Sequence, residues 1–177
     1  MKKIIAIIAL IIIFFIIYFL QTNFFIWFNI AGVMPNLFVI FTLFIGLFIG
    51  KKIGLILGFT FGLFIDILLG NGTYLSAILL GIIGLISEYL EKNFSKDSRI
   101  TIILIITSGT AFFEIIFYLS KIFTTSASLE IWQFIKILIV EIIFNILITI
   151  ILYPIMQKAG NKLENLFKNK NIMLKYF

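Results

Sequence analysis

The sequence lacks both cysteine and histidine over its 177 residues. Without cysteine no disulfide can form, and without either residue a thiolate or imidazole metal site is excluded. Catalysis by a Ser-His-Asp or Cys-His arrangement is excluded for the same reason. We therefore expect a protein that is not an enzyme and that holds no metal and no cofactor.

Charge and proline are also scarce. Charged residues make up 12% of the chain and there are 2 prolines, whereas 62% of the residues are hydrophobic and 22 are phenylalanine. A soluble domain is roughly half apolar and about a quarter charged. This composition leaves too little polar surface for a water-exposed globule, so it argues against a soluble enzyme, an extramembrane binding module and a disordered chain. An all-α integral membrane protein is predicted.

The apolar runs predict a bundle of six transmembrane helices in one domain, residues 1–155. A bilayer core of about 30 Å takes roughly 20 helical residues. Polar residues, Pro35-Asn36 and a Gly-Asn-Gly turn divide the runs. The predicted spans are about 4–20, 35–50, 53–69, 73–90, 100–120 and 131–154. The aromatic segment 24–30 is expected at the membrane interface, and Pro154 is expected to close the last helix.

The basic residues predict the orientation of this bundle. With the N-terminus in the cytoplasm, 12 of the 14 basic residues fall in cytoplasmic segments. Only Lys121 lies on the opposite side, and Lys136 lies inside a span. This asymmetry follows the positive-inside rule and places both termini in the cytoplasm. The net charge of +6 is then a topology signal, and no nucleic-acid partner is expected.

Five glycines recur at intervals of four residues. They are Gly46, Gly50, Gly54, Gly58 and Gly62. Residues four apart share a helix face, and glycine stripes let helices approach closely in lipid. The favoured interpretation is packing between the second and third predicted helices. The alternative is docking of a transmembrane helix from a partner.

Ionisable residues inside the predicted spans need an explanation because charge in the bilayer is costly. Asp66, Glu114 and Lys136 are predicted to share one layer in the outer half of the membrane, where Lys136 would pair with one of the two carboxylates. Glu141 lies deeper, and Asn145 follows it at i+4, where it could donate a hydrogen bond to Glu141. A buried polar lock that fixes helix register is favoured. The alternatives are a ligand or coupling site, a contact with a partner helix and, least favoured, acid-base catalysis.

The segment 156–177 is expected to be a basic cytoplasmic tail. Lys158, Lys162 and Lys168 lie among apolar residues in it. Such a segment can lie on the membrane, where basic residues attract anionic headgroups. A solvated tail is the equally weighted alternative.

The second and third predicted helices together resemble a known family. Pro35-Asn36 opens one helix, Lys51-Lys52 forms a short basic turn, and the glycine stripe of the next helix runs into Gly62-Leu63-Phe64-Ile65-Asp66. A Gly70-Asn71-Gly72 turn follows. In this order and spacing, residues 33–85 resemble the core of MreD, the family of bacterial rod-shape-determining membrane proteins.

The resemblance implies a non-catalytic scaffold in the bacterial cytoplasmic (inner) membrane. Proteins of this family associate with the bitopic protein MreC, and through it with the MreB filament, a SEDS glycosyltransferase and a penicillin-binding transpeptidase of peptidoglycan synthesis. It also implies a fold similar to the substrate-binding subunits of energy-coupling-factor transporters. The alternative function is therefore such a subunit, with a pocket lined by Asp66, Glu114, Lys136 and Trp132.

Overall fold

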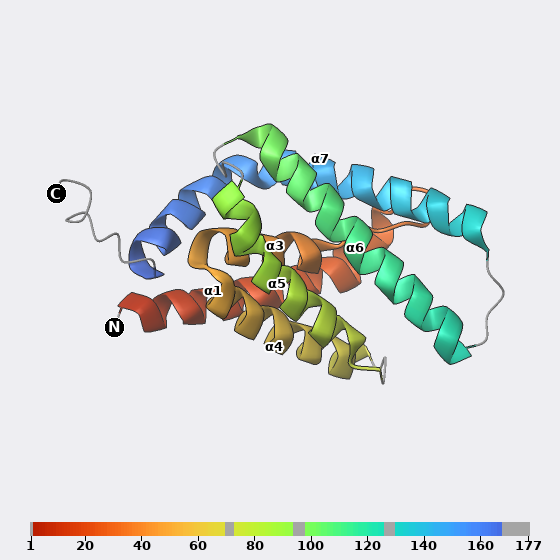
Figure 1. The fold of residues 1–177 in the computed structure, drawn as a ribbon, viewed down its shortest axis with the longest axis horizontal. Coiled ribbons are helices and arrows are strands. Elements are labelled where there is room, and N and C mark those ends of the chain that lie inside the picture. The colour runs from red at the N-terminus through yellow and green to blue at the C-terminus, as the bar shows by residue number, and fades with distance from the viewer. Residues whose placement is uncertain (1, 70–72, 94–97, 126–129, 168–177) are drawn as a thin grey trace.

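A computed structural model describes residues 2–69, 73–93, 98–125 and 130–167, and it confirms the all-α class. Within these residues the chain is a bundle of helices of very different lengths (Figure 1). Its elements are α1 (Lys2–Phe19), the π-helical turn η1 (Leu20–Phe24), α2 (Phe25–Trp27), α3 (Leu37–Ile49), α4 (Lys51–Leu69), α5 (Leu75–Asn93), α6 (Arg99–Thr125) and α7 (Ile131–Phe167).

The sequence predicted that the first helix ends at the polar residues 21–23, but in the structure it does not end there. It continues through η1 and α2 to Trp27. The polar side chains bond back to their own helix, since Thr22 Oγ1 donates to the Tyr18 carbonyl at 2.8 Å and Asn23 Nδ2 donates to the Phe19 carbonyl at 3.1 Å. The polar residues therefore mark a π turn, a feature often found at functional sites, rather than a helix end.

Helix α3 lies at the centre of the bundle. All of its residues, Leu37–Ile49, are buried, and it contacts α1, α4, α5, α6 and α7. It starts where Pro35-Asn36 predicted, with Asn36 Oδ1 accepting from the Val39 N–H at 3.2 Å as an N-cap. It ends at Gly50, whose φ of 113° lets a single residue join α3 to α4. Thirteen helical residues span about 20 Å, less than the bilayer core of about 30 Å, so one end of α3 lies inside the bundle.

The glycine stripe of α4 packs against α5, which lies beside it (Figure 1). A Cβ added at Gly54 would lie 2.5 Å from the Gly84 carbonyl oxygen and 2.9 Å from Gly46 Cα. Gly58 faces the backbone of Leu80 in the same way. The sequence predicted that the glycine stripe packs the second helix (α3) against the third (α4), but most of the stripe contacts α5. The glycine stripe is therefore not open to a partner helix.

The last helix is longer than predicted, because α7 passes through Pro154 and continues to Phe167. It bends in the part of the helix that contains Pro154, which cannot donate to the helical ladder, and then turns toward α1 (Figure 1). Met156, Leu163 and Phe167 pack against the core, and Gly160 is buried against Phe48. The first part of the expected tail is therefore a packed helix rather than a separate surface segment. Lys158 and Lys162 are exposed on it, and Lys168 lies outside the described residues.

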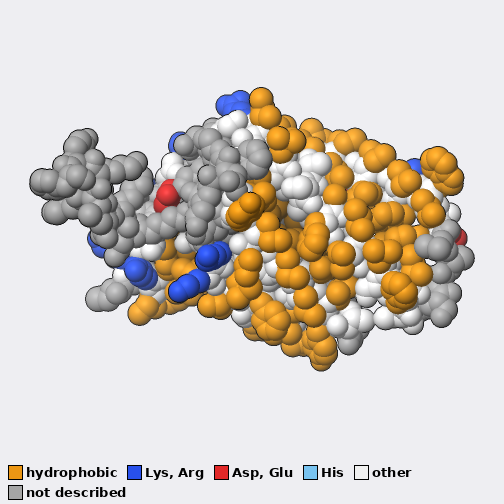
Figure 2. Space-filling view, in the orientation of Figure 1, with side chains coloured by type: hydrophobic (Ala, Val, Ile, Leu, Met, Phe, Trp, Pro, Cys, Tyr) orange, Lys and Arg blue, Asp and Glu red, His pale blue; other side chains and the backbone are white. Residues whose placement is uncertain are grey.

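The exterior of the bundle is apolar over most of its visible face, and lysine and arginine gather toward the end that holds the N-terminus (Figure 2). Among the described residues, three helical stretches are long and apolar enough to cross a membrane: Lys2–Trp27, Arg99–Thr124 and Ile131–Phe167. Leu37–Ile49 and Leu75–Ser87 are apolar but shorter. These features are those of a membrane protein.

Candidate functional site

The N-terminal end of α3 is held by two amide side chains from other helices. Gln21 of η1 donates from Nε2 to the Pro35 carbonyl at 2.7 Å and accepts the Leu37 N–H at Oε1 at 3.0 Å. The Asn36 N–H donates to Asn145 Oδ1 of α7 at 2.8 Å. A helix start inside an apolar bundle cannot rely on water, so these side chains satisfy its free backbone groups.

Asn145 also ties α7 to α6. Its Nδ2 donates to Thr110 Oγ1 at 2.9 Å, and both residues are fully buried. The bonds that Asn145 makes to α3 and α6 differ from our expectation from the i+4 spacing, which was a hydrogen bond to Glu141. A buried polar lock is present, but it is not the predicted one: it consists of Gln21, Asn36, Thr110 and Asn145, and of the predicted layer it contains only Asn145.

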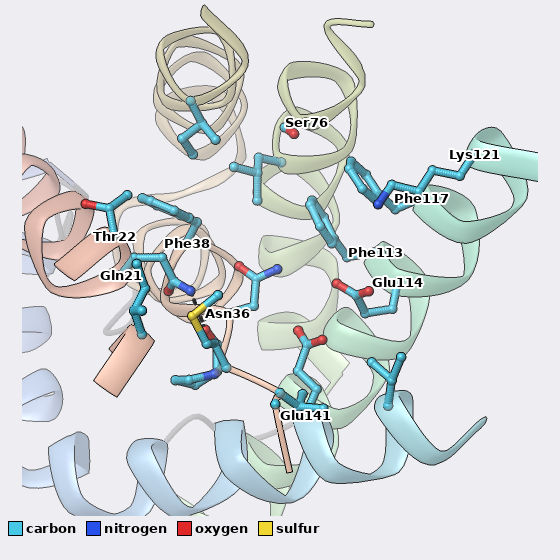
Figure 3. Close-up of a pocket in the computed structure, with 18 residues that line it drawn as sticks. Gln21, Thr22, Asn36, Phe38, Ser76, Phe113, Glu114, Phe117, Lys121 and Glu141 are labelled. Carbon is cyan, nitrogen blue, oxygen red and sulfur yellow. Dashed lines mark hydrogen bonds between the residues drawn. The ribbon is translucent and has the colours of Figure 1, made fainter. Parts of the chain in front are cut away.

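A cavity of about 600 Å³ opens beside this lock, where the short α3 leaves the space unfilled. Its walls come from η1, the segment 32–36, α6 and α7, with Ile65 of α4 and Ser76 and Leu80 of α5 (Figure 3). The wall formed by α6 carries Phe113 and Phe117, whose rings stack with centroids 5.7 Å apart. The polar lining includes Gln21, Thr22, Asn36 and Ser76.

Two carboxyl groups point toward one another in this cavity. They are Glu114 of α6 and Glu141 of α7 (Figure 3), and the Asn36 side chain lies close to both. Glu141 is only 6% exposed, and its Oε1 atom has no hydrogen-bond partner among the described residues. A buried polar atom without a partner is rare and calls for an explanation.

The cation near these carboxyls is Lys121, not Lys136 as predicted. Lys121 lines the cavity, attracts Glu114 electrostatically and places its Nζ 5.3 Å from the centre of the Phe117 ring. Lys136 is exposed and does not line the cavity, and Trp132 is 78% exposed. Helix geometry explains the difference. At 100° per residue, Lys136 and Glu141 point about 140° apart, whereas Glu114 and Lys121 point within about 20° of each other.

Asp66 does not join the carboxyl pair. Its Oδ2 accepts the N–H of Ala77, in the first turn of α5, at 3.1 Å. A carboxylate at a helix N-terminus satisfies a free donor and interacts favourably with the helix dipole. Gly62 lies one turn earlier, where a Cβ would lie 2.5 Å from the Ser76 carbonyl oxygen. The segment from Gly62 to Asp66 therefore packs α4 against the first turn of α5.

The cavity has the chemistry of a binding site. It combines aromatic and aliphatic walls with a few convergent polar groups, as ligand pockets do. The described residues contain no group of three acidic, cysteine or histidine side chains that could hold a metal ion.

Three residues of the site were missed from sequence. Gln21 and Thr110 were uncharged polar residues in apolar runs, and Gln21 was read as a helix boundary. Lys121 was placed outside the fifth helix because that helix was ended at Ser120, whereas α6 reaches Thr125. The seven-residue spacing from Glu114 to Lys121 was the signal that could have revealed the pair.

Comparison with known proteins gives a family match. The family model described as rod shape-determining protein MreD matches residues 1–163 of the 177. A search of curated proteins and a search of solved structures each gave no match. The match covers the polar lock, the cavity and the glycine-packed helices together. The chain therefore belongs to the MreD family of membrane proteins, whose role is the determination of rod shape.

Proposed function

We propose that the protein is a non-catalytic scaffold subunit of the cell-wall elongation complex in the bacterial inner membrane. In this role it spans the membrane six times with both termini in the cytoplasm, binds an MreC-type bitopic partner and helps to regulate peptidoglycan synthesis. The family match over residues 1–163 is the observation that carries the proposal. The MreB filament, the SEDS glycosyltransferase and the transpeptidase would be reached through the MreC-type partner.

The distribution of side chains supports a protein that works within the bilayer. Large apolar residues are exposed along α1, α6 and α7, while Asp66 and Glu141 are turned inward. Apolar side chains facing outward and ionisable ones facing the bundle interior are the arrangement that lipid requires. The exposed Lys158 and Lys162 would face anionic headgroups on the cytoplasmic side.

The partner helix would have to bind away from the glycine stripe. Gly54, Gly58 and Gly62 are already in contact with the backbone of α5. A substitution such as Gly58→Leu would therefore damage the bundle itself, and loss of the partner in that variant would say nothing about the docking surface. The remaining candidates are the exposed apolar faces of α1, α6 and α7 and the outer apolar faces of α4 and α5.

Affinity purification of the full chain in a mild detergent, followed by identification of bound proteins, tests the proposal. We expect an MreC-type protein to be recovered, together with other wall-synthesis proteins. Complementation of a strain that lacks its own rod-shape protein should restore rod-shaped cells. Recovery of no wall-synthesis protein, with no restoration of shape, would contradict the proposal.

The second candidate is the substrate-binding subunit of an energy-coupling-factor-type transporter, and the cavity of about 600 Å³ favours it. The same purification separates the two functions, because a transporter subunit should bring down an ATPase module. Uptake of a small solute that depends on Glu141 would support the transporter. Uptake unaffected by Glu141→Gln, with recovery of wall-synthesis proteins, would support the scaffold.

A further inference from the structure

The cavity beside α3 contains an acidic group that the fold leaves unsatisfied. Glu141 Oε1 has no hydrogen-bond partner within the described residues, although the side chain is only 6% exposed. The neighbouring polar side chains of Gln21, Asn36 and Asn145, in contrast, all make hydrogen bonds to backbone or side-chain groups. Among the described residues, the buried side-chain atoms without a partner are Asp66 Oδ1, Tyr118 Oη, Thr149 Oγ1 and Glu141 Oε1. Of these four residues, only Glu141 lines the cavity.

The cavity is large enough for a small ligand and is mostly apolar. Its volume of about 600 Å³ falls within the range of about 300–1,000 Å³ that is typical of ligand pockets. Phe38, Phe113 and Phe117 line it together with Ile137, so an apolar body would find aromatic and aliphatic contacts there.

The cavity holds two acidic side chains and one basic side chain. Glu114, Glu141 and Lys121 are the ionisable groups among its lining residues. Lys121 attracts Glu114 and places its Nζ over the Phe117 ring, so both of these contacts are with residues of α6. A ligand cation with hydrogen-bond donors could bind the two acidic side chains. A primary ammonium supplies three donors and one positive charge.

We propose that this cavity binds a ligand that carries a primary ammonium group on an apolar body. The ammonium lies between the Glu141 and Glu114 carboxylates, and the apolar body lies against Phe113 and Phe117. Two sources share this chemistry: the headgroup of an aminophospholipid and a free small amine. The site concerns the isolated chain, so it does not depend on the scaffold role proposed above.

A binding experiment on the full chain, purified in detergent, tests the site directly. The probe is phenethylammonium, titrated at neutral pH by calorimetry, with 2-phenylethanol as a neutral analogue of similar size. We expect saturable binding of phenethylammonium and at least tenfold weaker binding of 2-phenylethanol. Glu141→Gln should weaken phenethylammonium binding at least tenfold, whereas Glu130→Gln, which changes an exposed carboxylate outside the cavity, should leave it unchanged.

Native mass spectrometry distinguishes the two sources of the ammonium group. Retention of added phosphatidylethanolamine over phosphatidylglycerol, lost in Glu141→Gln, would support the site and assign it to a lipid headgroup. Binding of phenethylammonium without that lipid preference would support it and assign it to a free amine. If Glu141→Gln does not give a monodisperse protein, Glu114→Gln takes its place with the same tenfold expectation. Absence of saturable binding, or equal binding by the unchanged chain and the variant, would overturn the proposal.

Discussion

The α4–α5 contact and the cavity beside α3 differ in how closely the helices pack. At the contact, Gly54 and Gly84 bring two backbones so close that neither position has room for a Cβ. At the cavity, which lies beside the start of α3, Glu114 and Glu141 point toward one another and line open space. Close packing stabilises, whereas an unsatisfied carboxyl costs stability. The contact therefore maintains the fold, whereas the cavity is the place where we propose that a ligand binds.

The largest loss of stability is expected at the α4–α5 contact, in Gly54→Ala. The new Cβ would lie 2.5 Å from the Gly84 carbonyl oxygen, and backbone cannot move aside as a flexible side chain can. We expect the free energy of unfolding to fall by about 3 kcal/mol, the upper end of usual overpacking costs. Thermal unfolding in detergent measures it.

Gly81→Ala on α5 is the matched control for this prediction. The nearest atom to its new Cβ would be Phe59 Cβ at 3.4 Å, an ordinary contact. Alanine is favoured over glycine in a helix, so the unfolding midpoint should stay the same or rise. Equal losses in the two variants would show that the α4–α5 contact is not unusually tight.

A smaller loss is expected at the lock that holds the start of α3. Gln21→Ala removes both the donor to the Pro35 carbonyl and the acceptor of the Leu37 N–H. Leaving buried backbone groups unpaired costs about 1–3 kcal/mol, and we expect about 2 kcal/mol by thermal unfolding. Asn23→Ala, in the same π turn but exposed and bonded only to its own helix turn, should change stability by less than about 0.5 kcal/mol. An equally large loss in Asn23→Ala would assign the effect to the π turn rather than to the lock.

A loss of about 1 kcal/mol is expected in the part of α7 beyond Pro154. Leu163 is partly buried against the core, so Leu163→Ala removes less apolar contact than the 2–5 kcal/mol typical of full burial. The neighbouring Lys162 is exposed, and Lys162→Ala should have almost no effect on the unfolding midpoint. If the two variants unfold alike, this part of α7 contributes little to the bundle.

The sequence predicted the parts of the fold that are set by local chemistry. Pro35 and Asn36 mark a helix start because proline cannot continue a helical ladder and asparagine can cap one, and α3 begins there. The periodic glycines predicted a close helix contact because residues without a side chain let two backbones approach each other. The identity of the helix that fills the stripe was not predictable, because it depends on how Ala77, Leu80 and Gly84 of α5 are brought alongside.

The site was predicted less completely than the fold. Glu114 and Glu141 were identified because charge inside an apolar span is costly wherever it falls. Their surroundings were assigned incorrectly, since depth along a span was used without the direction of each side chain around its helix. Lys136 was predicted to share a layer with Glu114 but is exposed. Asn145 shares a helix face with Glu141 but bonds Asn36 and Thr110 instead.

If Glu141 serves ligand binding and not the fold, the unfolding midpoint of Glu141→Gln should reveal it. The substitution keeps the size of the side chain and removes a buried acidic group without a hydrogen-bond partner at Oε1. Residues kept for function often reduce stability. We therefore predict a midpoint equal to or above that of the unchanged chain, measured in detergent without added amine. A fall as large as that of Gln21→Ala would contradict the claim, because it would make Glu141 part of the structural lock.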